Sequence, residues 1–386
     1  MIIRSSLNPK TKITFIILII FLFINIIPSQ TAQIIILGGT SFITILLNLN
    51  QKIDKFSLIF IHYLLLSISI LVSNSSISIY YFLSELKILL LFIIPTLFFN
   101  IFKKTNPKIV MQYFFQIIIF LVLMVALYGL ITTGKLRYTG FLQYSIYISV
   151  CLSLLLSYLY DNIKLFWKIL IFIDILFLGS SSGVLVFFLT ILFKMKTSVW
   201  KKIFPLIIGG GISYWYAVVF RGRSIFNGGF LEIDRVQIFN AIIYYTKNNF
   251  TFMNYLFGFG IGHELDKFSF VGDNSSIKIA GFIGWFDKFT QNGVYSYAFH
   301  NEFLRLFYNF GFVGTFIILL YLYNRLPIST FVILLVAFLT NTVIYSSVGM
   351  LVTSMIIGAV QAENSQKSTE IIERKKLNYS RYQRLT

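Results

Sequence analysis

The sequence predicts an all-α protein, a polytopic bundle of about 12 transmembrane helices with one large, partly helical extracytoplasmic loop. The composition carries this prediction. Of the 386 residues, 57% are hydrophobic and only 12% are charged, whereas a soluble domain is about 45–50% apolar and about 25% charged. So few charged side chains could not cover the exterior of a water-soluble fold. Lipid is therefore the expected solvent.

The apolar segments have the length and spacing of successive membrane spans. Most approach the ~20 residues that cross ~30 Å of hydrocarbon. The runs 164–178 and 182–194 are shorter and flank Gly179–Gly183, so they form either one re-entrant element or two short helices packed against protein. The expected spans are 13–30, 32–49, 57–73, 86–102, 111–133, 141–159, 164–178, 182–194, 203–220, 301–322, 328–345 and 347–361.

The lysines and arginines orient these spans. Outside one long loop, most of them fall in alternate short links and in the C-terminal tail, which places both termini in the cytoplasm. The net charge of +18 therefore reflects membrane orientation, and no nucleic acid partner is expected. The first apolar run lacks a small-residue cleavage site, so no cleaved signal peptide is expected. The single cysteine, Cys151, excludes an intrachain disulfide.

Four regions follow from this arrangement: a bundle of nine spans over 1–220, an extracytoplasmic loop over 221–300, spans ten to twelve over 301–361, and a cytoplasmic basic tail over 362–386. The tail carries Arg374, Lys375 and Lys376 and is expected to be solvated, partly disordered and attracted to anionic lipid. The long loop contains Trp285 and many other aromatic residues, which is not the composition of a disordered segment.

A helix is predicted within the long loop, over 234–249. Asp234 is a plausible N-cap, and Val236, Phe239, Ile243 and Tyr244 follow at near-helical spacing. We therefore expect a folded loop with an amphipathic helix lying over the mouth of the bundle.

Arginines cluster in three segments on the predicted outer side: Arg137 in the link before span six, Arg221, Arg223 and Arg235 in the first part of the loop, and Arg305 near the start of span ten. The planar arginine fork donates two parallel hydrogen bonds to a phosphate and stays charged. Outer arginines run against the positive-inside tendency, and an anionic substrate such as a lipid-linked diphosphate explains them. The alternative for Arg221 and Arg223 is that they anchor span nine at the lipid headgroups.

His300 and Glu302 are the candidate acid–base groups. A near-neutral imidazole accepts a proton from a hydroxyl nucleophile or hydrogen-bonds a phosphate, and the alternative for His300 is a capping role at span ten. Glu302 either pairs with Arg305 three residues later or acts as an acid or base itself. No Walker motif, acidic cluster or Asp-x-Asp pattern is present, so no metal or cofactor is expected and the substrate must arrive already activated.

His300-Asn301, followed after nine residues by Gly311-Phe-Val-Gly314 at the head of a span, resembles the signature of the O-antigen ligase and polymerase superfamily. Asp234-Arg235, followed by the glycine-rich stretch 258–262, is similar to the family's loop. The segment 137–141 resembles its earlier outer link, and Gly179–Gly183 resembles a Ser-Arg-Gly stretch in which this chain lacks the arginine. The resemblance extends from about span five to span eleven.

The resemblance implies a metal-independent inverting glycosyltransferase that acts on undecaprenyl-diphosphate-linked glycans at the outer leaflet of the bacterial inner membrane. In its terms His300 is a candidate base or diphosphate ligand, and the diphosphate-binding candidates are Arg137, Arg221, Arg223, Arg235 and Arg305. Together with the reasoning from the residues, this makes His300, Arg235 and Glu302 the catalytic candidates. Asn301, Gly311 and Gly314 have supporting roles.

The leading function is polymerisation of lipid-linked repeat units into O-antigen or capsular polysaccharide. The second is an O-antigen ligase that transfers the glycan to lipid A–core. The third is a lipid-linked oligosaccharide flippase, a non-enzyme that would line its spans with charged residues. The expected partners are the lipid bilayer, glycan donor and acceptor on undecaprenyl diphosphate, a chain-length regulator and a flippase.

Overall fold

The computed structural model describes residues 62, 65, 87–103, 105–133, 145–215, 234–261, 263–265, 294–295, 301–340 and 343–383. These residues form helices and the turns that connect them, with one antiparallel pair of two-residue strands, β1 (Glu264–Leu265) and β2 (Val294–Tyr295). The all-α class is confirmed for the described part of the chain. The expected spans 13–30, 32–49 and 57–73 lie outside the described residues, except for positions 62 and 65.

The helices coincide with the expected spans. They are α5 (Lys87–Phe102), α6 (Pro107–Thr133), α7 (Ser145–Leu159), α8 (Leu165–Phe177), α9 (Ser181–Lys194), α10 (Val199–Trp215), α14 (Glu302–Arg325), α15 (Ile328–Thr340) and α16 (Ser347–Gln383). A short 3-10 helix, η2 (Tyr160–Asn162), follows α7. Pro107–Thr132 and Glu302–Arg325 are long and apolar enough to cross a membrane, and three other apolar helices are shorter. These helices point to membrane association, while the number of spans stays a prediction.

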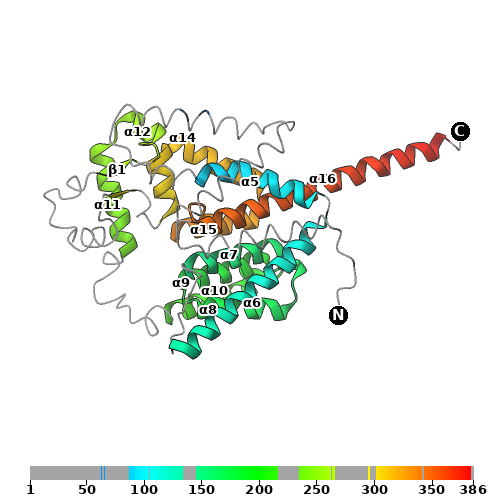
Figure 1. Ribbon diagram of the computed structural model, residues 1–386, viewed down its shortest axis with the longest axis horizontal. Helices are drawn as coiled ribbons and strands as arrows, with labels where there is room; N and C mark the ends of the chain where they lie inside the picture. Colours follow the sequence, from blue (N-terminus) through cyan, green and yellow to red (C-terminus); the bar gives the residue numbers. More distant parts are fainter. Residues whose placement is uncertain are drawn as a thin grey trace.

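α16 and α5 form the most extensive helix pair, and they lie side by side in Figure 1. Gly358 permits this approach, because a Cβ there would lie 2.5 Å from Phe98 Cβ and 2.8 Å from the Pro95 carbonyl oxygen. Pro95 has no N–H, so the Leu91 carbonyl one turn earlier loses its helical donor. The Tyr321 hydroxyl of α14 donates to that carbonyl at 3.2 Å, which ties α14 to α5.

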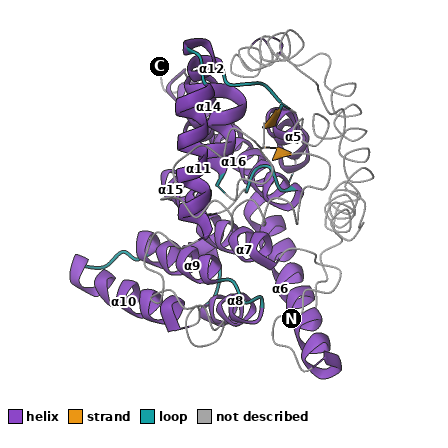
Figure 2. Cartoon of the chain, turned by 90° about the vertical axis from the view of Figure 1, so that its left-hand side faces the viewer, coloured by secondary structure: helices purple, strands orange, loops and turns teal. Residues whose placement is uncertain are grey.

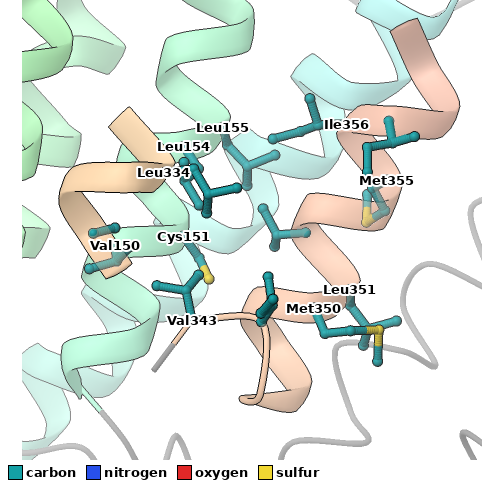
Figure 3. Packing of buried hydrophobic residues seen from close by; sticks show 14 of the residues in the cluster. Val150, Cys151, Leu154, Leu155, Leu334, Val343, Met350, Leu351, Met355 and Ile356 are labelled. Carbon is teal, nitrogen blue, oxygen red and sulfur yellow. The ribbon is translucent and has the colours of Figure 1, made fainter. Parts of the chain in front are cut away.

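The apolar core continues between α7, α15 and α16. Figure 3 shows Cys151 and Leu155 of α7 facing Leu334 of α15 and Met355 of α16, all of them buried. Cys151 is a free thiol inside this layer. The core thus joins the middle of the chain to its C-terminal helices.

Two separate helices, α8 and α9, occupy the region of the two short runs. Gly179 takes a positive φ of 66° between them, and Ser180 caps α9 by accepting a hydrogen bond from Gly183 N at 3.0 Å. α9 lies against α7 and α10. Figure 2 shows α8, α9 and α10 as one group apart from α12 and α14. Of the two alternatives, a pair of short packed helices fits this region.

Charged side chains from links that are distant in sequence meet at one end of the bundle. Lys108 lies 3.8 Å from Glu363 of α16, and Lys196 lies 4.0 Å from Asp161 of η2. Lys194 is within electrostatic range of both Lys108 and Asp161. These are links that the charge pattern assigns to the cytoplasmic side, so their proximity agrees with the predicted orientation.

The C-terminal tail is helical through Gln383, since α16 continues without a break. The expectation of partial disorder is therefore wrong over 362–383. Gln366 anchors the transition by donating to the Thr105 carbonyl at 2.8 Å, and the following side chains, 367–373, are exposed. Extending an existing helix avoids the cost of nucleation, and Lys, Glu, Gln and Arg favour the helical state. In Figure 1 this part of α16 projects from the end of the molecule opposite α11 (Asp234–Asn249) and α12 (Phe252–Phe257).

Candidate functional site

The predicted site residues divide into described and undescribed groups. Arg137, Arg221, Arg223 and His300 lie outside the described residues. For Arg235 the structure gives the backbone, in the first turn of α11, but not the side chain. Asn301, Glu302, Arg305, Gly311 and Gly314 are described on α14 or at its cap.

Asn301 caps α14. Its side-chain oxygen accepts a hydrogen bond from Leu304 N at 3.1 Å, which satisfies one of the amides at the helix start. Its side-chain nitrogen donates to the Leu339 carbonyl near the end of α15 at 3.0 Å. The predicted supporting residue thus fixes the beginning of α14 against α15.

Three polar residues of α14 converge on one tyrosine, and we call Glu302, Arg305, Asn309 and Tyr345 the α14 head cluster. Glu302 Oε1 accepts a hydrogen bond from Tyr345 N at 3.2 Å. The Arg305 guanidinium lies 3.8 Å from the centroid of the Tyr345 ring, and Asn309 Nδ2 donates to the Tyr345 hydroxyl at 3.0 Å. Positions 302, 305 and 309 share one helix face, so a single tyrosine contacts all three.

The α14 head cluster is buried. Glu302 and Asn309 are 0% exposed, Arg305 is 5% exposed and Tyr345 is 4% exposed. Charged groups are removed from water at a high cost unless they are paired and hydrogen-bonded. A cation over an aromatic face and a carboxylate that accepts a backbone N–H provide compensation of this kind. The cluster holds one acid and one permanent cation close to the helix start, the groups needed for proton transfer and for binding an anionic leaving group.

α14 is bent at Gly311, where φ is 61° and ψ is −166°. Figure 1 shows the two parts of this helix running in different directions. Gly258, which follows α12, has φ 77° and ψ −174°. A Cβ at Gly311 would overlap the backbone of Leu256, and a Cβ at Gly258 would overlap the backbone of Asn309. Each glycine therefore lets its own chain cross the other in direct backbone contact.

Hydrogen bonds join the two chains at this glycine crossing. Phe259 N donates to the Tyr308 carbonyl at 2.8 Å, and Gly260 N donates to the Asn309 carbonyl at 3.1 Å. The bend releases these carbonyls from the helical pattern, and the loop supplies their donors. The glycine-rich stretch is thus the point where the long loop attaches to the kink of α14.

α12 is fixed by its own cap. Thr251 Oγ1 accepts from Asn254 N at 3.3 Å, and Asn254 Oδ1 accepts from Thr251 N at 3.1 Å. The Asn254 amide also donates to the Gly258 carbonyl at 3.3 Å. The reciprocal capping box starts α12 at Thr251, and the bond from Asn254 to Gly258 ties the end of the helix to the glycine crossing. Figure 2 shows α12 beside α14, in agreement with their extensive contact.

His263 extends the attachment beyond the glycines. Its Nδ1 lies 2.7 Å from the Tyr308 hydroxyl, and its ring stacks on Phe259 with the centroids 4.4 Å apart. Burial lowers the pKa of His263 from 6.5 to about 4, because the charged imidazolium loses its hydration. The ring is therefore neutral near pH 7 and serves as a hydrogen-bonding partner for Tyr308.

The predicted loop helix is confirmed as α11, and the residues of its predicted apolar face that the structure describes are exposed. Phe239 and Ile243 are 43% and 45% exposed, whereas Ile242 and Tyr245 are 0% and 3% exposed. Tyr245 packs on Tyr308, with ring centroids 6.2 Å apart. α11 contacts α14 through this buried side, so helical spacing alone could not say which apolar residues would face the protein.

Sequence reasoning missed Tyr345, Asn309 and Tyr308. Tyr345 is the last residue of the predicted span 328–345, so its side was available from the span pattern, but its contact with Arg305 was not. Asn309 lies seven residues after Glu302, and that helical spacing was the signal that could have indicated it. Tyr308 has no such signal, because its partners come from the loop.

Among the described residues, no group of three or more His, Cys, Asp or Glu side chains could hold a metal ion. Comparison with models of protein families, with curated proteins and with solved structures finds no match to this chain. The arguments for function therefore come from the residues themselves and from the motif resemblance.

Proposed function

We propose that this chain is a metal-independent glycosyltransferase that polymerises undecaprenyl-diphosphate-linked repeat units into O-antigen or capsular polysaccharide. It would work at the outer leaflet of the bacterial inner membrane, as a bundle of about 12 spans with both termini in the cytoplasm. The proposal combines the motif resemblance with the geometry of the α14 head cluster.

One observation carries the proposal. The glycine crossing and the Tyr245–Tyr308 contact bring three segments together: the helix that carries Arg235 in its first turn, the glycine-rich stretch, and the first turns of α14. The same three segments carry the family-like motifs. Their meeting at one end of the bundle, opposite the lysine-rich links, is the arrangement expected of an outward-facing site (Figure 1).

The distribution of buried charge favours an enzyme over a flippase. Among the described residues, the buried charged side chains are Asp174, Glu302 and Arg305. Two of these three belong to the α14 head cluster, and only Asp174 lies elsewhere along the helices. A translocation path for a charged lipid headgroup would need polar groups along its length.

In the proposed reaction, an acceptor hydroxyl oxygen attacks the anomeric carbon of the donor sugar. The new glycosidic bond forms as the bond from that carbon to the diphosphate oxygen breaks, and undecaprenyl diphosphate leaves with the bonding electrons. The hydroxyl proton passes to His300 or Glu302. Arginines stabilise the charge that develops on the diphosphate, with Arg235 and Arg305 as the proposed contacts.

Glycan analysis after gene deletion tests the proposal. Loss of a polymerase leaves single repeat units on the final acceptor, loss of a ligase leaves long chains on the lipid carrier, and loss of a flippase leaves precursors in the cytoplasmic leaflet. Complementation with Arg235→Ala or His300→Ala should give no long-chain glycan while the protein remains in the membrane. Arg374→Ala, in the basic tail, should restore it. Wild-type glycan with both site variants would refute the site assignment.

A further inference from the structure

The lengths of two helices indicate how deep in the membrane the first part of α14 lies. From Phe312 to Arg325, the second part of α14 rises about 21 Å at 1.5 Å per residue. This falls short of the ~30 Å of a hydrocarbon core, and any tilt shortens the rise further. If Arg325 marks the cytoplasmic edge, the kink at Gly311 lies roughly 9 Å below the outer edge of the hydrocarbon.

α15 gives a second measurement of this depth. It starts at Ile328, directly after the same cytoplasmic turn, and rises about 18 Å to Leu339. Asn301 donates its hydrogen bond to the Leu339 carbonyl, so the start of α14 lies at that level. Both ends of the first part of α14 are therefore at nearly equal depth, and this part runs along the membrane plane.

We infer that the first part of α14, with α12 packed on it, forms a re-entrant layer inside the outer leaflet, with lipid acyl chains as the partner of its exposed face. The inference rests on the membrane arrangement in the proposed function and changes one of its features. The attached segment of the long loop would lie in the membrane rather than over the mouth of the bundle.

The backbone of the loop segment meets the requirement of that environment. Irregular backbone at membrane depth is tolerated where its polar groups have partners within the protein. Gly258 N donates to the Asn254 carbonyl at 2.7 Å, and Phe259 N and Gly260 N donate to the carbonyls at the α14 kink. The capping box of α12 satisfies the start of that helix.

The side chains are divided as lipid contact requires. Phe252 and Met253 of α12 are 74% and 58% exposed, and Phe312 of α14 is 61% exposed. Phe307 connects the two helices, since its ring lies 4.7 Å from Phe312 and 6.2 Å from Tyr255. The polar α14 head cluster is turned inward and buried. Apolar groups outside and polar groups inside are the pattern of protein surrounded by hydrocarbon.

Nitroxide accessibility tests the inference. Met253→Cys would be made in a Cys151→Ala background, spin-labelled, and reconstituted in phosphatidylethanolamine–phosphatidylglycerol vesicles. Its collision rates with oxygen and with a polar nickel chelate are then compared with two controls. Phe316→Cys lies on the second part of α14 and is exposed to lipid in this account, and Ser368→Cys lies on the exposed end of α16. Phe252→Cys provides a second reporter from α12.

The inference predicts that nickel collisions at Met253 and Phe252 match those at Phe316 and fall about tenfold or more below Ser368, because a polar chelate is desolvated at high cost in hydrocarbon. Nickel access at both α12 positions equal to that at Ser368, with Phe316 protected, would overturn the re-entrant layer alone. Nickel access at Phe316 as well would overturn the membrane arrangement on which the proposed function depends.

Discussion

Alanine at Gly311 should separate the long loop from the head of α14. The backbone there, at φ 61° and ψ −166°, lies in a region that is essentially restricted to glycine, and strain of this kind costs about 1–3 kcal/mol. The added methyl group would also overlap the backbone of Leu256, and overpacking costs about 1–3 kcal/mol more. The sum, roughly 2–6 kcal/mol, is comparable with the free energy that holds a local unit in place.

The measurement is thermal unfolding of purified protein in detergent, together with protease sensitivity of the loop. Gly311→Ala should lower the Tm by several degrees and increase cleavage between α11 and α14. Gly210→Ala is the matched control, since a Cβ at Gly210 in α10 meets nothing within 4 Å and a helical alanine is favoured over glycine by about 1 kcal/mol. Wild-type Tm and cleavage in Gly311→Ala would refute the glycine crossing.

Changes at three further positions test other contacts by the same unfolding assay. Tyr345→Phe should lower the free energy of unfolding by about 1–3 kcal/mol, because it removes the hydroxyl that accepts from Asn309. Tyr345→Ala should lower it by about 3–5 kcal/mol, because it also removes the ring beneath Arg305. Equal losses in the two variants would contradict the α14 head cluster. Gly358→Ala should cost about 1–3 kcal/mol, because its Cβ would lie 2.5 Å from Phe98 Cβ, and an unchanged Tm would argue against the α5–α16 contact. Burial lowers the pKa of His263 from 6.5 to about 4, so the unfolded chain binds the proton first as the pH falls. The stability contributed by the neutral ring is fully present above pH 6.5, and the free energy of unfolding decreases by about 3 kcal/mol as the pH falls to about 4. Between pH 7.5 and 5, the wild type should therefore lose more stability than His263→Gln, and parallel losses would contradict this.

The positions of the helices could be predicted from the sequence because hydrophobic runs and their boundaries are local properties. The run 86–102 appears as α5 over Lys87–Phe102, and the glycine-bounded stretch after 178 separates α8 from α9. α11 begins at the residue expected to start it, Asp234. In each case a short stretch of sequence contains the physical cause, whether an apolar period, a glycine or a helix cap.

The site geometry could be predicted only in part, because it depends on contacts between distant segments. Gly311 was identified as a motif residue, but its bend becomes understandable only with Leu256 in contact. The buried side of α11 contains Ile242 and Tyr245, and spacing alone does not indicate which apolar residues meet the protein. The contact of Tyr345 with Arg305 joins a short link to a helix start forty residues earlier, and no periodic pattern encodes it.

The most direct test of the central claim is polymerisation by the purified chain in vesicles that contain undecaprenyl-diphosphate-linked repeat units. With EDTA present and no nucleotide supplied, the account predicts a ladder of lengthened glycans and release of undecaprenyl diphosphate, with neither product from Arg235→Ala protein of unchanged Tm. Repeat units that remain unextended in vesicles containing folded wild-type protein, or that are extended only when a divalent metal is added, would contradict it.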